Sequence, residues 1–252
     1  MHQEITFIGH STILIDIEGF KIITDPIFSK WVYGIPRAKK VNIEIDDLKN
    51  DVDLILISHA HKDHLNKKSL NHFQKDIPIA SHSDNKKYIS KCKFTNILQF
   101  AYWESKLFNK DAIRVTSVPA YHGKTLPWGP IGTSGGFVIE STDKTIYFAG
   151  DTAYDSGLFK TIRTKFDIDV LLMPIGAYSP RWMLRNEHTN PDEALKTMHV
   201  LKAKTMIPIH WGSYMFALDT PKQPIRILKK RIMGTNLEKK VRILKNGESM
   251  SL

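Results

Sequence analysis

The sequence has a single cysteine, Cys92, among 252 residues, and its opening residues contain no long apolar run. One cysteine cannot form an intrachain disulfide, and it cannot build a thiolate metal cage, which fits a reducing compartment. The polar start, residues 1–4, leads into an apolar segment that is too short for a signal-peptide core or a membrane span. These absences predict a cytoplasmic protein.

Acidic residues are also in deficit, since 36 lysines and arginines face 26 aspartates and glutamates, for a formal charge of +10. Such a surplus favours anionic partners, namely phospholipid surfaces, nucleic acids or phosphorylated metabolites, without choosing among them. The basic residues are scattered, so a solvated surface is the simpler interpretation. Because there is no basic stripe interleaved with aromatics, we expect no stable nucleic-acid complex. Contact with the inner membrane face and homo-oligomerisation stay open.

The apolar pattern predicts a layered α/β protein. With 42% hydrophobic residues and no repeat or linker, the chain is expected to form one domain over 1–252. Hairpin strands are predicted over 4–8, 13–17 and 20–24, and the continuously apolar run 53–57 indicates a strand buried on both faces. Further strands are expected at 77–80, 113–118, 135–140, 145–149, 169–173 and 205–209, and helices near 67–74, 83–91, 155–165, 191–202 and 223–233. Hairpins followed by strand and helix alternation predict a sandwich of mixed sheets.

The strongest chemical signal directly follows the buried strand. Residues 58–65 read Ser-His-Ala-His-Lys-Asp-His-Leu, which is improbable by chance with 11 histidines in 252 residues. Because side chains alternate along an extended chain, His59 and His61 point the same way and can grip one ion. A turn beyond them lets Asp63 and His64 face a neighbouring ion. A histidine-rich surface turn is the weaker alternative.

Three further metal-type ligands stand just past the ends of apolar strands. His122 follows residues 115–119, Asp151 follows 146–150, and His210 follows 206–209. Layered α/β proteins assemble their sites from loops at such strand ends. A lone histidine there is usually a core or surface residue, but three such residues added to the histidine run favour a metal centre.

Counting the ligands predicts two ions with an open position on each, which is typical of a catalytic site. The ligands divide into His59, His61 and His122 for one metal, Asp63, His64 and His210 for the other, and Asp151 as a bridge. Two cations about 3.5–4 Å apart can share a water, lower its pKa towards roughly 7 and hold the attacking and leaving oxygens. Nitrogen and oxygen ligands favour zinc, with manganese or iron as alternatives.

These residues resemble the signature of the metallo-β-lactamase superfamily, a His-x-His-x-Asp-His run with later His, Asp and His ligands in this order. Within it the chain is most similar to the branch of N-acyl-phosphatidylethanolamine-hydrolysing phospholipase D, and more distantly to ascorbate-6-phosphate lactonase. The matching segments are collinear and cover nearly the whole chain; they are residues 9–12, 24–29, 150–152, 174–182, 188–194, 209–212 and 244–249.

The resemblance implies an αββα sandwich, a dinuclear centre on the seven ligands above, and a hydroxide that attacks a phosphodiester. It also points to His188 as a residue on the substrate side of the metals. We therefore expect Asp63, His188 and Arg181 to take part in catalysis, with Arg181 clamping a phosphate through its planar fork. A surface salt bridge is the alternative for Arg181, and polarity at a helix entry is the alternative for His188.

Several supporting residues have two interpretations each. Asp25 either orients a metal-bound histidine or is a plain turn residue. His10 is interpreted as structural. The segment with Trp31, Tyr33 and Ile35 either touches lipid or, more simply, packs on the core.

The leading function is hydrolysis of a phosphodiester, with a lipid or small-molecule substrate. The alternative is a lactonase or ester hydrolase that acts on a phosphorylated sugar, since the same nucleophile attacks a carbonyl carbon. Nucleic-acid processing is a weaker third hypothesis.

Overall fold

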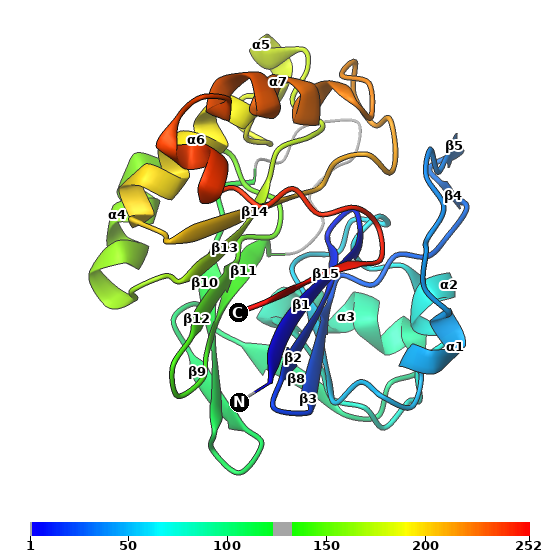
Figure 1. Ribbon diagram of the computed structural model, residues 1–252. Helices are drawn as coiled ribbons and strands as arrows, with labels where there is room; N and C mark the ends of the chain where they lie inside the picture. The colour runs from blue at the N-terminus through cyan, green and yellow to red at the C-terminus, as the bar shows by residue number, and fades with distance from the viewer. Residues whose placement is uncertain (1, 123–132) are drawn as a thin grey trace.

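Two mixed β-sheets stack face to face and carry helices on their outer sides (Figure 1). The computed structural model describes residues 2–122 and 133–252. One sheet is ordered β15 (Glu248–Ser251), β1 (Gln3–Gly9), β2 (Thr12–Ile17), β3 (Phe20–Thr24), β6 (Leu54–Ile57), β7 (Ile79–His82) and β8 (Ile97–Phe100). The other is ordered β14 (Thr205–Ile209), β13 (Val170–Pro174), β12 (Thr145–Phe148), β11 (Gly135–Glu140), β10 (Ile113–Pro119) and β9 (Ser105–Phe108). A small hairpin, β4 (Trp31–Val32) with β5 (Ile35–Pro36), stands apart from both.

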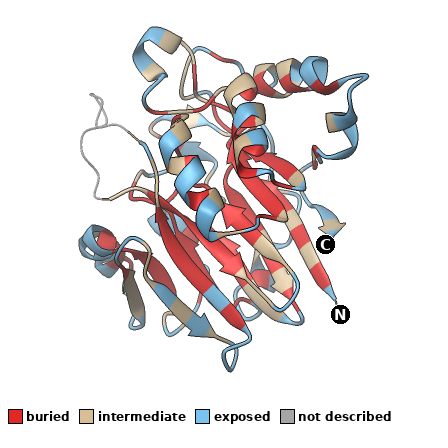
Figure 2. Ribbon diagram, turned by 90° about the vertical axis from the view of Figure 1, so that its left-hand side faces the viewer, coloured by how far each residue is buried: buried red, intermediate tan, exposed pale blue. Residues whose placement is uncertain are grey.

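Alternation along the strands explains why the first sheet needs layers on both faces. In β6, Leu54 and Leu56 join the core between the sheets, whereas Ile55 and Ile57 belong to a second cluster with the side chains of the nearby helices. All four side chains are fully buried, as Figure 2 shows for most of the strand residues. The continuous apolarity of this segment therefore reflects burial on both faces, as predicted.

Helices cover the outer sides of the sandwich. On the side of the second sheet lie α4 (Ser156–Lys165), α6 (Pro191–Leu201) and α7 (Gln223–Ile232), which contribute Phe159, Met198 and Leu228 to the core between and around the strands. The short α1 (Ile45–Leu48), α2 (Lys67–Leu70) and α3 (Lys86–Ile89) cover the first sheet. The remaining short helices are α5 (Arg181–Leu184) and the 3-10 turns 83–85, 90–92 and 236–239.

The αββα architecture and every strand expected from the sequence are present, with shifts of at most a few residues at their ends. The helix expected at 67–74 is wrong in extent, since α2 ends at Leu70. The helix expected at 83–91 is present over residues 83–92, where a single α-helical turn stands between two 3-10 segments. Patterning missed the edge strands β8, β9 and β15 and the β4–β5 hairpin. Edge strands such as β9 alternate only between exposed and partly buried residues, so they lack the apolar signal of a central strand.

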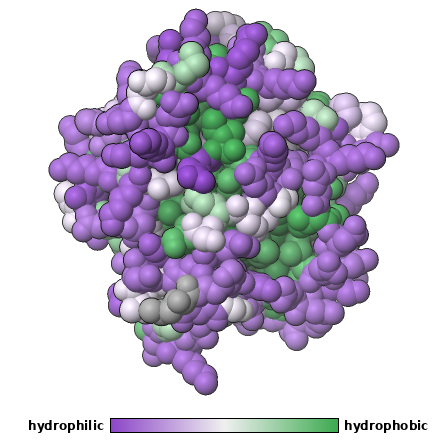
Figure 3. Space-filling view, in the orientation of Figure 1, coloured by the Kyte–Doolittle hydropathy of each residue, from purple (hydrophilic) through white to green (hydrophobic). Residues whose placement is uncertain are grey.

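The outside of the molecule is mainly polar. On the face drawn in Figure 3, hydrophilic side chains dominate and hydrophobic ones show between them, in keeping with the charge of +10. Among the described residues, no helix has the length and apolarity needed to cross a bilayer.

Candidate metal centre

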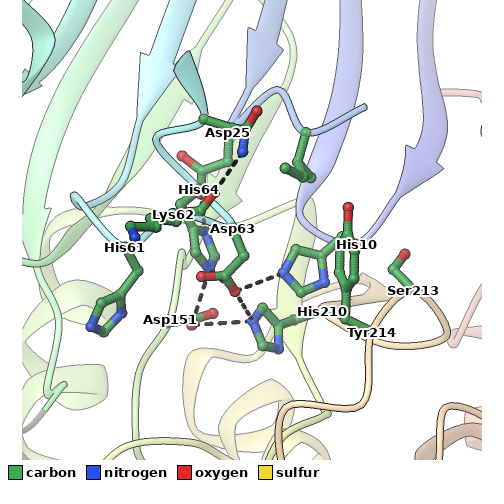
Figure 4. A network of polar contacts seen from close by, with 12 residues as sticks. His10, Asp25, His61, Lys62, Asp63, His64, Asp151, His210, Ser213 and Tyr214 are labelled. Atoms are coloured by element: carbon green, nitrogen blue, oxygen red, sulfur yellow. Dashed lines mark hydrogen bonds and ion pairs between the residues drawn. The ribbon is translucent and has the colours of Figure 1, made fainter. Parts of the chain in front are cut away.

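Segments far apart in the sequence bring their polar residues to one edge of the sandwich. His10 follows β1, Asp25 follows β3, the histidine run follows β6, Asp151 comes shortly after β12, and His210 directly follows β14. Neighbouring parallel strands end at the same edge, so the loops that leave them meet there. Figure 4 shows the side chains of several of these loops converging on a common point.

The first set of ligands, which we call the trihistidine group, consists of His59, His61 and His122. His61 Nδ1 lies 2.8 Å from His59 Nε2 and 3.2 Å from His122 Nε2. The far nitrogen of His59 contacts Ser58 Oγ at 3.0 Å, and His122 Nδ1 donates to the carbonyl of Glu187 at 2.8 Å. Because those outer nitrogens carry the protons, the inner ones present lone pairs to one point, which suits a cation.

The second set, the aspartate group, consists of Asp63, His64 and His210. Asp63 Oδ2 lies 3.4 Å from His64 Nε2 and 3.5 Å from His210 Nε2. His10 joins the group, with its Nε2 3.0 Å from the same oxygen. The atoms of these four residues that could bind an ion lie within 4.8 Å of one another. His10 therefore lies in the centre beside the three predicted ligands, a place that its interpretation as a structural residue did not specify.

Asp151 stands between the two groups. Its Oδ2 lies 3.1 Å from His64 Nε2, 3.2 Å from His210 Nε2 and 4.0 Å from His59 Nε2. The tight turn that delivers it needs Gly150, whose φ is +62° and where an added Cβ would stand 2.7 Å from Ser58 Cβ. The carboxylate is thus held where the sequence analysis expected a bridge.

Buried polar atoms that lack a hydrogen-bond partner show whether these residues are suited to bind metal ions. Within the described residues, several buried atoms have no hydrogen-bond partner: His64 Nε2, His188 Nδ1, both ring nitrogens of His210, and Asp151 Oδ1. Buried polar atoms are normally paired, so such a concentration in one place calls for an explanation. Divalent cations accept lone pairs from imidazole nitrogen and carboxylate oxygen, and they would satisfy one nitrogen of each ring together with the carboxylate oxygen. The residues of the centre are therefore suited to bind divalent metal ions.

Asp25 holds ligands from behind. Its Oδ2 accepts from His64 Nδ1 at 2.7 Å and from Ser58 Oγ at 2.6 Å, and its Oδ1 accepts from the Ser58 amide at 2.7 Å. Since Ser58 Oγ in turn contacts His59, one buried carboxylate orients a histidine in each group. Of its two interpretations, the orienting role describes these contacts.

The two groups differ in the charge that they carry without metal. Burial, helped by the neighbouring His122, lowers the pKa of His61 to about 4, and burial likewise holds the pKa of His59 well below its usual range. Burial also acts on His210, but attraction to Asp151 outweighs it and raises the pKa of His210 to about 9. The pKa of His64 is raised for the same reason.

A pocket opens on the centre. Its described lining includes the ligands His61, Asp63, Asp151 and His210, together with Tyr33, Ala177, His188 and Phe216. His188 approaches the metals as expected, with Nδ1 3.7 Å from Asp151 Oδ2 and the side chain 14% exposed. Burial holds the pKa of its ring well below the usual range, so this ring is neutral at pH 7.

Arg181 departs from its predicted placement. Its guanidinium donates to both carboxylate oxygens of Glu193, at 2.7 and 3.0 Å, and to the carbonyl of His188 at 2.7 Å. It is not among the described residues that line the pocket. The prediction that Arg181 faces the metals as a phosphate clamp is therefore corrected: the arginine supports the backbone of His188 through an ion pair.

Part of the pocket wall was only partly anticipated. Phe216 and Ala177 carry no chemical signature in the sequence, and their place follows from the fold. Tyr33 comes from the β4–β5 hairpin, which was expected to touch lipid or the core; Val32 and Ile35 of that hairpin pack with Ile27 and Tyr214. Residues 123–132, which directly follow His122, lie outside the described part of the chain.

Comparison with known sequences finds related hydrolases. N-acyl-phosphatidylethanolamine-hydrolyzing phospholipase D 1 of Caenorhabditis elegans is 31% identical over 232 residues, which are 83% of this chain and 64% of that protein. The mitochondrial phospholipase of the same name from Saccharomyces cerevisiae is 30% identical, and the match covers 88% of this chain and 51% of that protein. A UPF0173 metal-dependent hydrolase of Pyrococcus furiosus is 31% identical over 99% of both chains. The chain thus spans about half to two thirds of the phospholipases and the full length of the archaeal relative.

Solved structures share the fold. A possible metal-dependent hydrolase from Veillonella parvula superposes with a TM-score of 0.83 over all of both chains at 20% identity. An isothiocyanate hydrolase from Delia radicum gut bacteria also has a TM-score of 0.83, at 21% identity, over 99% of this chain and 98% of that one. Residues 21–211 match the family model of the beta-lactamase superfamily domain. Together with the histidine and aspartate metal site, these matches confirm that the chain belongs to the metallo-β-lactamase superfamily and is a metal-dependent hydrolase.

Proposed function

We propose that this hydrolase cleaves phosphodiesters with two divalent ions, zinc being favoured by the ligand set. The observation that carries the proposal is the position of Asp151, whose Oδ2 faces His59 of the trihistidine group and both histidines of the aspartate group. A carboxylate placed in this way has two oxygens to share between neighbouring ions. The relatives named as phospholipases support the substrate class.

When bound, two such ions would supply Lewis acidity and a water that is deprotonated near neutral pH. The chain itself supplies the orientation of the ligands. Asp25 accepts the Nδ1 proton of His64, and through Ser58 it fixes the proton on Nδ1 of His59, so the Nε2 atom of each ring faces inward and would give its lone pair to a bound ion. This preorganisation costs no rearrangement when substrate arrives.

His188 is suited to act on the substrate. Its ring lines the pocket, and its buried Nδ1 has no hydrogen-bond partner among the described residues. The backbone is fixed from two sides, because its amide donates to Leu184 at 3.0 Å and its carbonyl accepts from Arg181. A neutral imidazole here donates one hydrogen bond to a phosphoryl oxygen or to the departing alkoxide.

The surroundings of the pocket favour a substrate with an apolar part. Phe216 lines the pocket, and its neighbours Met215 and Leu218 are 46% and 69% exposed. The Leu218 amide donates to Ser179 at 2.9 Å, which ties this loop to the segment that carries Trp182, 80% exposed. Large exposed apolar side chains in adjoining segments are typical of surfaces that meet apolar ligands or lipid. We include peripheral contact with a lipid surface in the proposal on this ground.

One observation favours the second candidate, hydrolysis of a carboxyl ester or lactone. No lysine or arginine stands among the described residues that line the pocket, and Arg181 is engaged by Glu193. A fixed cation is the usual partner of a phosphate oxygen. An uncharged ester needs none, and the same centre attacks a carbonyl carbon.

The test compares both substrate types on protein of known metal content. We expect turnover of bis(p-nitrophenyl) phosphate by wild-type protein, loss of it in His59→Ala, and its retention in His72→Ala, which removes an exposed histidine outside the centre. Phosphodiesters with longer alkyl chains should be cleaved with a lower KM if the apolar rim is used. Turnover of a sugar-phosphate lactone or p-nitrophenyl ester alone would replace the proposal by the second candidate, and turnover of neither would refute both.

A further inference from the structure

The turn between β1 and β2 places an unassigned histidine in the metal centre. His10 is only 2% exposed, and its φ of 61° lies in the left-handed region. A bulge interrupts the pairing of β1 with β2 between Phe7 and Gly9, just before it. A side chain other than glycine in this conformation is uncommon, and it costs free energy that the surroundings must offset.

His10 contacts two ligands of the aspartate group through different atoms. Its Nε2 lies 3.0 Å from Asp63 Oδ2, and its backbone carbonyl accepts from the His210 amide at 2.8 Å. The ring also packs on His210, with centroids 4.1 Å apart, and meets the ring of Tyr214 edge-on at 5.5 Å. Tyr214 is itself anchored, because its hydroxyl donates to the carbonyl of Ser29 at 2.6 Å. The ring is therefore held in one orientation.

The contact with Asp63 shows whether His10 Nε2 is a hydrogen-bond donor or a metal ligand. An ionised carboxylate only accepts hydrogen bonds, so the nitrogen 3.0 Å from it must carry a proton. A protonated nitrogen has no lone pair in the ring plane for a metal. A carboxylate oxygen, in contrast, has room both to accept this bond and to ligate an ion.

We infer that His10 is a positioning residue, which donates from Nε2 to Asp63 and so fixes the carboxylate that the aspartate group offers to its ion. Through its carbonyl the same residue sets the backbone of His210. One turn of the first hairpin thus holds two of the three ligands in this group, while the trihistidine group has no contact of this kind with it among the described residues. The inference depends on the two-ion centre and not on the substrate.

Three variants test it. His10→Phe keeps an aromatic ring beside His210 and Tyr214 but removes the donor; His10→Gln places an amide donor near the position of Nε2; and His72→Phe makes the same exchange at an exposed histidine outside the centre. All three leave the backbone bond from His210 to residue 10 unchanged. Metal-free protein is titrated with Co²⁺, and binding is followed by visible absorbance and by metal analysis after gel filtration, which needs no substrate.

We expect wild-type, His10→Gln and His72→Phe proteins to bind two ions. In His10→Phe the ion of the aspartate group should bind about ten- to a hundredfold more weakly, which is the range for loss of an outer contact to a ligand. The affinity of the trihistidine group for its ion should stay unchanged, which would show that the fold is intact. Wild-type affinity for both ions in His10→Phe would overturn the inference. Equal loss in His10→Gln and His10→Phe would also overturn it and make His10 a ligand. If wild-type protein bound only one ion, the proposed two-ion function would fail instead.

Discussion

The trihistidine and aspartate groups use the same imidazole ligand in opposite charge states. In the trihistidine group burial and the neighbouring rings keep His59 and His61 neutral, with the pKa of His61 at about 4. In the aspartate group the carboxylates of Asp63 and Asp151 hold protons on His64 and His210, and the pKa of His210 stands at about 9. One group is therefore ready for a cation, whereas the other must release protons first.

Protonated His64 and His210 balance the buried carboxylates of the aspartate group when no metal is bound. Two buried carboxylates with no counter-charge would be costly, and protonated histidines supply that charge until an ion does. The pKa values of Asp63 and Asp151 are held well below their usual range: burial opposes this, and the nearby histidines outweigh it. Proton and metal ion are thus alternative occupants of the aspartate group.

The largest effect should follow from removing the negative charge of Asp151, which lies between the two groups. Asp151→Asn removes the carboxylate that lies between the two groups, and its charge would attract both ions. Metal binding should therefore weaken by more than the roughly 10- to 100-fold that is typical for loss of an outer contact to a ligand. We expect metal analysis to show loss of the ion held by the aspartate group, and turnover should fall with it.

Asp155→Asn is the matched control on the same loop. Asp155 caps α4 by accepting from the Leu158 amide at 2.8 Å, and asparagine caps as well as aspartate. Its metal content should equal that of wild type. Two tightly bound ions and normal turnover in Asp151→Asn would contradict the ligand assignment.

The pH dependence of binding should separate the two groups. The ion of the aspartate group must displace protons from both His64 and His210, whose pKa values are raised, so its apparent affinity should rise with pH by about tenfold per pH unit for each displaced proton. The part that comes from His210 should level off above about pH 9. His59 and His61 of the trihistidine group have no proton to displace in this range, because burial lowers their pKa values, so the affinity of this group should rise less steeply with pH. Chelator competition at several pH values measures both, and equal slopes would remove the distinction between the groups.

The same shift predicts how the metal-free fold responds to pH. Because the pKa of His210 is raised from 6.5 to about 9, its charge stabilises the folded state fully below pH 6.5, and this contribution is lost as the pH rises through 9. The metal-bound protein should lack this loss. Thermal melts of both forms between pH 6 and 9.5 would show it.

Asp25 connects the groups, so its removal should affect both. Asp25→Asn disturbs the bond to His64 and the chain through Ser58 to His59, and loss of such outer contacts typically costs about 10- to 100-fold in metal affinity. Ser58→Ala removes the contact to His59 and one hydrogen bond to Asp25, but it leaves the bond from His64 to Asp25, so it should weaken the trihistidine group more than the aspartate group. Titration with Co²⁺ resolves the two steps. An equal effect of Ser58→Ala on both ions would show that the groups are not separately oriented.

The ligands and the central strands could be predicted from the sequence because each leaves a local pattern. His59, His61 and His64 follow a buried strand at a spacing that few other structures require. The continuous apolarity of strands such as β6 indicates that they are buried on both faces. Strand ends meet at one edge, which is why His122, Asp151 and His210 could be joined to the run from sequence alone.

Other parts of the centre leave no local pattern. The role of His10 arises from its distance to Asp63, 53 positions further along the chain, and a bulged turn brings them together. Arg181 was misplaced because its partner is set by the fold: α5 and the start of α6 bring it to Glu193, which also closes the capping box with Asn190. Long-range pairing of this kind follows from packing and not from residue type.

The smallest effect is expected at Arg181. Its ion pair with Glu193 is partly exposed, at 31% and 21% for the two side chains, and such pairs contribute about 0–1 kcal/mol. Arg181→Ala should keep both metals, and turnover should fall less than about tenfold, the factor that 1.4 kcal/mol would produce. Because the arginine acts through the backbone of His188, phosphodiester and carboxyl ester hydrolysis should fall by the same factor. Arg185→Ala, an exposed arginine next to α5, is the matched control and should change neither. If turnover of the phosphodiester alone fell about a hundredfold, the guanidinium of Arg181 would have to leave Glu193 and contact the phosphate.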